Sequence, residues 1–401
     1  MRTTWNFFSA GHLHFGRGAV RQMGAFAGRL KVDRVFIVTD PVLVEVGLLE
    51  RVKTPLEEAG VWTETFDGGE PEPSIEAANR AVEAAKAFGP DCILGLGGGS
   101  NMDLAKYVAA SVTHGGNPSD YFGWDNVPGP VCPLICVPTT SGTGSEVSHA
   151  AVLTDTANEM KVSCLSNYLR PALAVVDPEL TLSCPPKATA DSGIDALTHA
   201  IEAYTAIDYQ RLDVPAGQTW PYDGRTPLGD ALAEKAVQLI ARHLRGAVHD
   251  GDDIEAREGM SLAATLAGMA FSNYGVALVH ALEYPLGGTL HCSHGAGNGL
   301  LLPYVMRYNL PERQPALAKL APLLGVDVAK IDECEVAEAA ISAVEQLRAD
   351  IGIPQRISEI GGREEQLPMF AEKSFAIKRL MMLNPRTPSE NDLLEILRAA
   401  F

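Results

Sequence analysis

Apolar residues in the first half of the chain gather in short runs that alternate with longer amphipathic stretches. The short runs have the length and composition of buried strands, and they cover residues 34–40, 61–66, 91–96 and 133–138. Between them, residues 74–88 and 102–112 repeat apolar side chains at helical spacing, and Ser74 is a suitable N-cap for the first of these helices. Strands that alternate with helices predict a largely parallel sheet with helices on its faces.

The pattern changes near residue 185, after which nearly every apolar residue follows helical spacing. The predicted helices cover residues 188–205, 229–248, 253–273, 276–282, 311–324, 336–351 and 390–399. We therefore predict an α/β plus all-α fold. A mostly parallel, dinucleotide-binding α/β domain occupies residues 1–185, and an all-helical metal-binding and catalytic domain occupies residues 186–401. Residues 208–227 are rich in proline, glycine and aromatic side chains and are long for a loop, which suggests a lid or an insertion.

Composition and charge narrow the class of protein. Hydrophobic residues make up 46% of the 401 residues, enough for ordinary globular cores. A net charge of −18 disfavours nucleic acid and anionic membranes as partners. Seven scattered cysteines, Cys334 among them, form no CxxC pair and suit a reducing compartment with free thiols. The chain shows neither an apolar signal core at its N-terminus nor an apolar run long enough to cross a membrane, so we expect a cytoplasmic protein.

A glycine-rich turn joins the strand at residues 91–96 to the next helix. Its residues are Gly97, Gly98, Gly99 and Ser100. Three glycines let the backbone approach a ligand, and the helix beginning near Asn101 points free N–H groups at it. A pyrophosphate would suit this turn, although an ordinary strand-to-helix turn is the alternative. The turn is not a GxGxxG fingerprint.

Residues 138–146 follow the next buried strand and concentrate hydroxyls and glycines where open α/β sheets bind ligands. The hydroxyls expected to contact the cofactor belong to Thr139, Thr140 and Thr143. Asp40 ends the first strong strand, and an acid there can bind a ribose hydroxyl and repel a 2′-phosphate, which favours NAD over NADP. The alternative is that Asp40 caps the next turn.

The helical half contains residues that could bind a metal. Asp195 and His199 are four residues apart, so they share one helix face. His280 lies among apolar residues, and His294 follows a break expected at Gly287-Gly288. One carboxylate and three imidazoles could bind iron(II) or zinc(II) and leave a position open. The alternative is that these are hydrogen-bonded core histidines.

Four blocks of the sequence resemble the iron-containing alcohol dehydrogenase family in order and separation. They are residues 97–106, residues 138–146, SGIDALTHAIEAY at 192–204 and HALEYPLGGTLHCSHGAGNGLLLPYVMRYN at 280–309. The resemblance implies a dehydroquinate-synthase-like fold of two domains. It also implies four metal ligands: Asp195, His199, His280 and His294. It places NAD on the Gly97–Ser100 turn and the threonine loop, with Asp103 and Lys161 as further contacts.

The chain departs from the family pattern in three places. Tyr284 occupies a position where many members have a histidine that relays the alcohol proton, Pro71-Glu72-Pro73 replaces Pro-Asn-Pro, and residues 208–227 look like an insertion. These departures resemble the hydroxyacid–oxoacid transhydrogenase branch, which oxidises 4-hydroxybutyrate and keeps its cofactor bound. We expect His280, Tyr284 and His294 to act at the reacting atoms. His291 or a water chain is the alternative relay.

The predicted function is metal-dependent hydride transfer between NAD and a small primary alcohol or hydroxy acid. Alternatives are the transhydrogenase, dehydroquinate synthase or glycerol-1-phosphate dehydrogenase, and a protein that binds metal and nucleotide without turnover. Arg170, Arg211 and Arg225 are candidates for binding a substrate carboxylate, with surface solvation as the simpler reading, and Cys292 could line the pocket or only pack. A homo-oligomer, dimer or larger, is the default expectation for the assembly.

Overall fold

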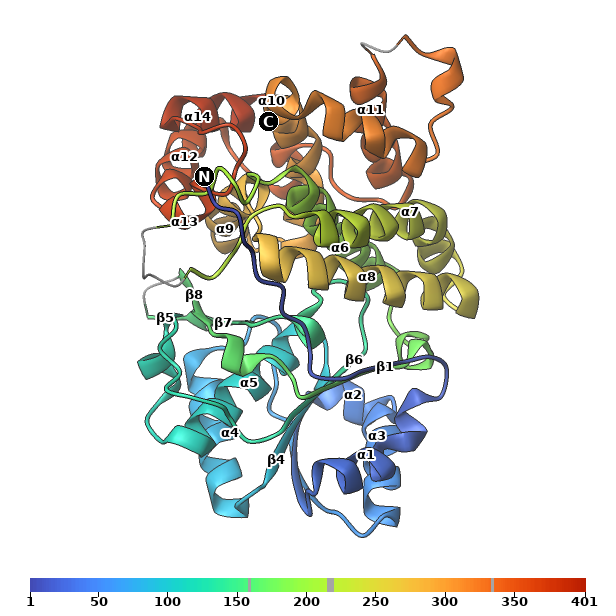
Figure 1. The fold of residues 1–401 in the computed structure, drawn as a ribbon, viewed down its shortest axis with the longest axis vertical. Helices are drawn as coiled ribbons and strands as arrows, with labels where there is room; N and C mark the ends of the chain where they lie inside the picture. Colours follow the sequence, from blue (N-terminus) through green and yellow to red (C-terminus); the bar gives the residue numbers. More distant parts are fainter. Residues whose placement is uncertain (158–159, 215–219, 333–334) are drawn as a thin grey trace. The chain divides into compact units, whose positions relative to one another are not determined.

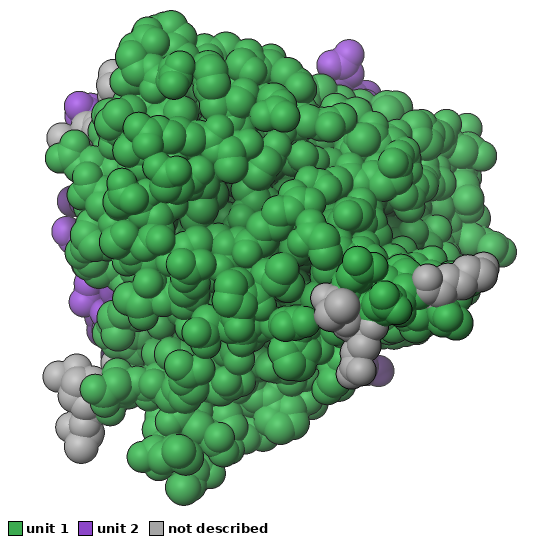
Figure 2. Space-filling view, turned by 90° about the horizontal axis from the view of Figure 1, so that it is seen from above, with its two compact units in different colours: residues 1–7, 185–401 green, residues 8–184 purple. Residues whose placement is uncertain are grey.

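The structure is a computed structural model that describes residues 1–157, 160–214, 220–332 and 335–401. The chain divides into two compact units, coloured separately in Figure 2. The α/β unit comprises Phe8–Cys184, and the helical unit comprises Met1–Phe7 together with Pro185–Phe401. The first seven residues differ from the sequence prediction, which places them in the α/β domain. They join the helical unit because Arg2 and the backbone N–H of Asn6 bind the carboxylate of Asp223.

The α/β unit contains a six-stranded parallel sheet, as predicted (Figure 1). Its strand order is β1-β9-β6-β4-β2-β3. The strands are β1 (Leu13–Phe15), β2 (Arg34–Val38), β3 (Trp62–Phe66), β4 (Cys92–Gly97), β6 (Leu134–Pro138) and β9 (Leu173–Val176). In the register of the sheet Gly97 lies opposite Pro138, so the glycine turn and the threonine loop leave adjacent strands at the same edge.

Helices cover both faces of this sheet because side chains alternate along each strand. Val35 and Ile37 of β2 point into one core, whereas Phe36 and Val38 point into the other. The first core also contains α1 (Met23–Leu30) and α3 (Leu48–Glu58), and the second contains α4 (Ile75–Phe88) and α5 (Gly99–His114). The predicted N-cap of α4 is confirmed, since Ser74 Oγ accepts from the N–H of Ala77 at 3.0 Å.

A second, three-stranded sheet was not predicted. It has the order β5-β8-β7, from β5 (Gly123–Trp124), β7 (Ala150–Asp155) and β8 (Met160–Leu165). Strands β7 and β8 form an antiparallel pair that lies partly open to solvent. Short, partly exposed strands carry a weak apolar signal, which explains why the sequence pattern did not show them.

The helical unit contains no named strand in the part of residues 185–401 that the structure describes. Its main helices are α6 (Pro186–Thr205), α7 (Pro227–His249), α8 (Ile254–Tyr274), α9 (Leu278–Leu290), α10 (His294–Leu323), α11 (Val336–Asp350), α12 (Leu367–Phe375), α13 (Lys378–Met381) and α14 (Glu390–Ala399). Helix α6 is buried along most of its length and packs against α7, α8 and α10 (Figure 1). The sequence pattern therefore located most of these helices correctly.

Two helix boundaries differ from the prediction. The break expected at Gly287-Gly288 is wrong, because α9 continues through both glycines and ends before His291, whose left-handed φ of 53° stops the helix. Helix α10 begins at His294, well before the expected start at residue 311, and bends at Arg313. A glycine inside a helix costs only about 1 kcal/mol relative to alanine, so two glycines need not end a helix that its other residues favour.

Two further expectations from the sequence concern the cysteines and membrane-spanning helices. Six cysteines within them are free, and Cys334 lies outside the described residues. No single described helix combines the length and apolar character of a membrane span; α8 and α9 reach them only when taken together across a bend of 103°.

Candidate metal centre

Helix α6 brings Asp195 and His199 together on one buried face. Asp195 Oδ1 lies 3.8 Å from His199 Nε2. The two residues are only 2% and 5% exposed, so neither is a solvated surface group. A spacing of four residues on a helix produces this approach, as the sequence pattern suggests.

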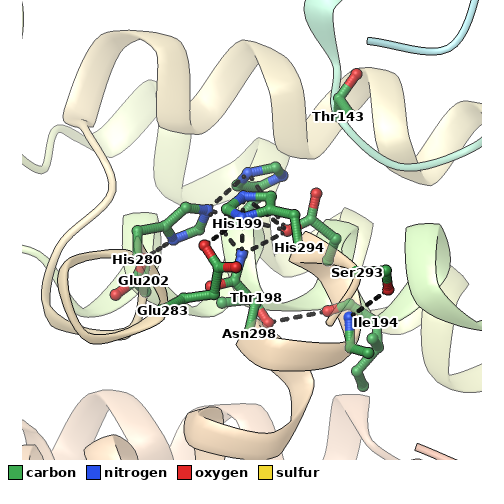
Figure 3. Close-up of polar contacts among 12 residues, drawn as sticks. Thr143, Ile194, Thr198, His199, Glu202, His280, Glu283, Ser293, His294 and Asn298 are labelled. Carbon is green, nitrogen blue, oxygen red and sulfur yellow. Dashed lines mark hydrogen bonds and ion pairs between the residues drawn. The ribbon is translucent and has the colours of Figure 1, made fainter. Parts of the chain in front are cut away.

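Helices α9 and α10 add two imidazoles to the same point (Figure 3). His280 lies in the first turn of α9, and His294 is the first residue of α10, after the N-cap Ser293. Asp195 Oδ1 is 3.9 Å from His280 Nε2 and 4.0 Å from His294 Nε2. The ligand atoms of Asp195, His280 and His294 all lie within 4.8 Å of one another. Three of the four predicted ligands thus form one compact group.

His199, the fourth predicted ligand, lies at the side of this group. Its Nε2 is 3.1 Å from His280 Nε2. Its ring stacks on Phe271, with centroids 4.1 Å apart and planes 19° apart. Burial lowers the pKa of His199 to about 4, despite the opposing effect of Asp195, so the imidazole is neutral at neutral pH. A neutral imidazole is the form that binds a metal.

Two buried glutamates that the sequence analysis missed stand behind two of the imidazoles. Glu202 Oε2 accepts from His280 Nδ1 at 2.6 Å, and Glu283 Oε2 accepts from His294 Nδ1 at 2.5 Å. Glu202 follows His199 by three residues and Glu283 follows His280 by three, so helical spacing could have indicated them. Each glutamate serves a histidine from another helix, which spacing alone does not reveal.

The hydrogen bonds to these glutamates decide which lone pairs face the centre. A carboxylate only accepts, so each imidazole donates from Nδ1, which leaves Nε2 as the nitrogen that can offer a lone pair to a metal. The Nε2 atoms of His280 and His294 then face Asp195 Oδ1, which is also an acceptor. Acceptor atoms that face one another inside a protein are unfavourable unless a cation or hydrogen-bond donors lie between them. The residues present therefore fit a divalent metal with imidazole and carboxylate ligands, such as iron(II) or zinc(II).

Asn298, one helical turn after His294, also reaches this point (Figure 3). Its Nδ2 lies 2.8 Å from Asp195 Oδ1, 3.1 Å from His280 Nε2 and 3.2 Å from His294 Nε2. An NH2 group has two hydrogens and cannot satisfy three acceptors at once. Its Oδ1 is buried and has no hydrogen-bond partner among the described residues. At least one of these three acceptor atoms is therefore left without a donor from Asn298, and a cation would satisfy it.

The two side chains considered for proton relay, Tyr284 and His291, belong to α9 and to its C-cap, respectively. The ring of Tyr284 is 6.1 Å from that of His294 between centroids, so the structure brings these two side chains together. His291 is exposed at the C-cap of α9. Cys292 is partly buried and packs against the helical core, in keeping with the simpler of its two predicted roles.

The arginines considered for a substrate carboxylate are mostly engaged elsewhere. Arg170 donates to the carbonyl of Val147 at 2.8 Å within the α/β unit. Arg225 donates from Nε to Asp230 Oδ1 at 2.9 Å within the helical unit. Arg211 is exposed. The expectation of surface solvation is therefore wrong for Arg170 and Arg225, which are partly buried and hold neighbouring segments in place.

The glycine turn and the threonine loop adjoin within the α/β unit. Gly97 has φ +142° and ends β4, and Gly98 is the N-cap of α5. A Cβ on Gly99 would lie 2.7 Å from the side chain of Thr143, and one on Gly98 would lie 3.5 Å from Thr140 Oγ1. The approach at Gly99 requires glycine, whereas a Cβ on Gly98 would make an ordinary contact, so the two candidate cofactor loops adjoin at the N-terminus of α5. Thr139 is buried beside them.

Asp40 is the N-cap of helix α2 (Pro41–Glu45), which was the alternative to its cofactor role. Its Oδ1 accepts from the N–H groups of Val42 and Leu43 at 3.0 and 3.1 Å. Its Oδ2 accepts from Asn101 Nδ2 at 2.7 Å, so the carboxylate is tied to the first turn of α5. A contact with ribose stays a prediction.

The last two predicted cofactor contacts, Asp103 and Lys161, bind other residues of the α/β unit. Asp103 is mostly buried and accepts from Ser145 Oγ at 2.6 Å and from the N–H of Val152 at 2.9 Å. These contacts favour a role in holding the threonine loop over a direct contact with cofactor. Lys161 lies on β8 and pairs with Glu72 at 2.8 Å.

Comparison with known families finds matches over most of the chain. Residues 10–178 match the family profile described as iron-containing alcohol dehydrogenase. Residues 221–401 match the profile described as the C-terminal part of the Fe-containing alcohol dehydrogenase family. The two matches cover most of both compact units and include His280 and His294, whereas Asp195 and His199 lie between them.

Individual relatives agree with these matches. The long-chain-alcohol dehydrogenase 1 of Geobacillus thermodenitrificans is 38% identical over 97% of this chain and 94% of its own length. The NAD-dependent methanol dehydrogenase of Bacillus methanolicus is 36% identical over 98% of this chain and 99% of its own. A solved structure of a 1,3-propanediol oxidoreductase superposes with a TM-score of 0.92 at 35% identity, covering 99% of this chain and 100% of that one.

Proposed function

The chain belongs to the iron-containing alcohol dehydrogenase family and is an NAD-dependent alcohol dehydrogenase, and we propose that it oxidises small primary alcohols at the metal centre of its helical unit. The proposed ligands are one carboxylate and three imidazoles: Asp195, His199, His280 and His294. The observation that carries this assignment is the convergence of ligand atoms of Asp195, His280 and His294 within 4.8 Å, with carboxylates fixing Nδ1 of the two imidazoles. His199 joins the set through its Nε2, which lies 3.1 Å from His280 Nε2. Iron(II) is the proposed metal and zinc(II) the alternative.

The overall reaction removes a hydride from the alcohol carbon and a proton from its oxygen. The products are an aldehyde, NADH and a proton. When bound, a divalent metal supplies Lewis acidity, which lowers the pKa of the alcohol hydroxyl in oxidation and polarises the carbonyl in reduction. The side chains of this chain bind that metal, and Glu202 and Glu283 hold two of the imidazoles in the orientation and tautomer that binding requires.

The proton from the alcohol needs an acceptor near the ligands. We propose Tyr284, because its ring lies beside that of His294. His291, which is exposed at the end of the same helix, and a chain of waters are the alternatives. A phenol in this place passes a proton onward instead of storing it, because its ordinary pKa is near 10.

The proposed seat of NAD is the surface formed by the glycine turn and the threonine loop in the α/β unit. The free N–H groups and positive end of α5 favour a pyrophosphate there. Asp40 and Lys161 complete the proposed contacts, with Asp40 favouring NAD over NADP, and Asp103 holds the threonine loop through Ser145 and Val152. The support for this assignment is that glycines at 97–99 allow a close backbone approach at the end of a parallel strand.

The substrate class follows from the relatives. Those described above act by their names on long-chain alcohols, methanol and 1,3-propanediol, and this chain is proposed to accept unbranched primary alcohols and diols. None of those three is described as a transhydrogenase. The departures at Tyr284 and Glu72 are the observations that favour that second candidate function. A cytoplasmic homo-oligomer stays a prediction.

A substrate panel tests the proposal. Metal-free protein is loaded with iron(II) or zinc(II) and given short alcohols, diols and hydroxy acids, with and without free NAD. We expect NADH to form with primary alcohols only when both metal and free NAD are present. Turnover of 4-hydroxybutyrate with an oxoacid, without free NAD, would instead support the transhydrogenase. Loaded protein that oxidises none of these substrates would contradict both.

A further inference from the structure

Glu72 has a backbone conformation that its side chain does not favour. Its φ is +51°, and it is one of four non-glycine residues with positive φ in the described ranges. A non-glycine residue is strained in this left-handed region, so its surroundings must hold it there. Pro71 and Pro73 flank it and restrict the backbone on both sides.

The loop around Glu72 is fixed between the small sheet and the glycine turn. The N–H of Thr154 in β7 donates to the carbonyl of Pro73 at 2.8 Å, and Thr154 Oγ1 donates to the carbonyl of Glu72 at 3.1 Å. The N–H of Glu72 donates to Ser100 Oγ at 3.3 Å. Glu72 therefore lies directly beside the residue that completes the glycine turn.

The carboxylate of Glu72 is directed to Lys161 of β8. Its Oε1 lies 2.8 Å from Lys161 Nζ, and the two side chains are 48% and 16% exposed. An ion pair this open to solvent contributes little to folding, so it does not by itself explain a charged residue in this strained position. Strain that a fold does not need for stability points to a role in binding.

We propose that Glu72 weakens and tunes the hold of the α/β unit on its dinucleotide by neutralising the ammonium of Lys161 beside the anion-binding turn. The inference rests on the proposed seat of NAD. The positive end of α5 and the charge of Lys161 both attract phosphate, whereas the carboxylate of Glu72 opposes them. A cofactor with a further phosphate, which adds about two negative charges, is penalised more, so Glu72 also acts against NADP.

The test uses the whole protein and measures the dissociation constants of NADH and NADPH by fluorescence titration. Glu72→Gln keeps the shape of the side chain and removes its charge. We expect the Kd for NADH to fall roughly 3-fold and that for NADPH to fall roughly 10-fold at low ionic strength. Both gains should shrink at high salt, because exposed charges are screened.

Additional variants separate charge from loop structure. Glu72→Asn is also neutral and tolerates the left-handed conformation better, so it should reproduce the gain even if the glutamine variant disturbs the loop. Glu76→Gln is the matched control, since Glu76 is an exposed glutamate in the next helix whose carboxylate contacts Thr156, and it should change neither constant. In a Lys161→Ala background, Glu72→Gln should lose most of its effect.

The possible outcomes are distinct. Weaker NADH binding in both Glu72 variants would show that Glu72 holds Lys161 in place for the cofactor, and this would overturn the proposal. Unchanged constants, or an equal gain in Glu76→Gln, would overturn it as well. A parent protein that binds neither dinucleotide would contradict the proposed seat itself, which is a different result from a parent that binds and variants that do not differ.

Discussion

Asn298 illustrates how side chains that are not metal ligands can decide the properties of a metal centre. Its amide approaches Asp195, His280 and His294 from one side, and it lies fully buried in α10. The bond to Asp195 Oδ1 is the shortest of the three and can persist when that oxygen also binds a metal, because a carboxylate oxygen has more than one lone pair. We infer that Asn298 orients Asp195 toward the metal.

Replacing Asn298 by alanine should weaken metal binding without unfolding the protein. Loss of a partner that orients a ligand typically reduces metal affinity about 10- to 100-fold, and we expect the lower end for zinc(II) or cobalt(II). Competition with a chelating dye measures this affinity, and the visible spectrum of the cobalt(II) form reports the ligand geometry.

Asn309→Ala is the matched control for this variant. Asn309 is a buried asparagine on the same helix, and its amide pairs with Asn384 at 2.9 Å, away from the ligand atoms. This control should lose stability and keep its metal affinity. Equal metal affinity in Asn298→Ala and the parent protein would refute the orienting role.

Single residues also show where sequence reasoning stops. Asp195 and His199 could be paired because four residues span one helical turn. Glu202 and Glu283 could not be assigned to their histidines, since each contact joins two helices whose packing is set by the whole core. Asp103 shows a different limit. A charged side chain beside a glycine turn suggests a contact with a ligand, whereas this one is mostly buried and accepts from Ser145.

At the scale of elements, helix α5 is tied to the unpredicted small sheet by a buried lysine. Lys106 is completely buried, and its Nζ donates to Ser145 Oγ at 2.7 Å, to Ser148 Oγ at 3.1 Å and to the carbonyl of Ala150 at 2.7 Å. Burial lowers the pKa of Lys106 and raises that of Asp103, 3.7 Å away. The lysine therefore anchors the threonine loop to the helix whose N-terminus is the proposed phosphate seat.

Lys106→Met should destabilise the α/β unit. Methionine retains the length of the side chain, but it leaves Asp103 without its cation and the carbonyl of Ala150 without this donor. We expect a loss of about 3 kcal/mol in the free energy of unfolding, measured by urea denaturation. Lys86→Met is the control. Lys86 is exposed and forms an ion pair with the exposed Glu83, so this variant should lose less than about 0.5 kcal/mol in the free energy of unfolding. Similar losses in both variants would contradict the anchoring role.

Elements with strong periodicity could be predicted, and those without it could not. Strand β4 and helix α4 carry uninterrupted apolar patterns, and the structure has both within a residue of the expected bounds. Strands β7 and β8 are stabilised by pairing with each other and by contacts from α5, which a local pattern does not contain. Helix α9 passes through Gly287 and Gly288 although only the first is buried, so a propensity argument placed a break where none exists.

At the scale of the whole molecule, the two halves of the reaction are assigned to separate compact units. The proposed metal ligands come from three helices of the helical unit, and the proposed dinucleotide seat comes from strand ends of the α/β unit. The apolar pattern indicated such a division, because it predicts strands alternating with helices before residue 185 and only helices after it. Residues 1–7 join the helical unit through Asp223, a long-range contact that no local pattern reveals.

We propose that one cation, held by Asp195 and the three imidazoles, is required for hydride transfer to NAD. The most direct test measures metal content and NADH formation together in the parent protein and in His280→Ala. We predict about one iron or zinc ion per chain in the parent protein, and we predict that the variant loses the bound metal and the turnover in parallel. A variant that forms NADH at the parent rate without bound metal would contradict the account.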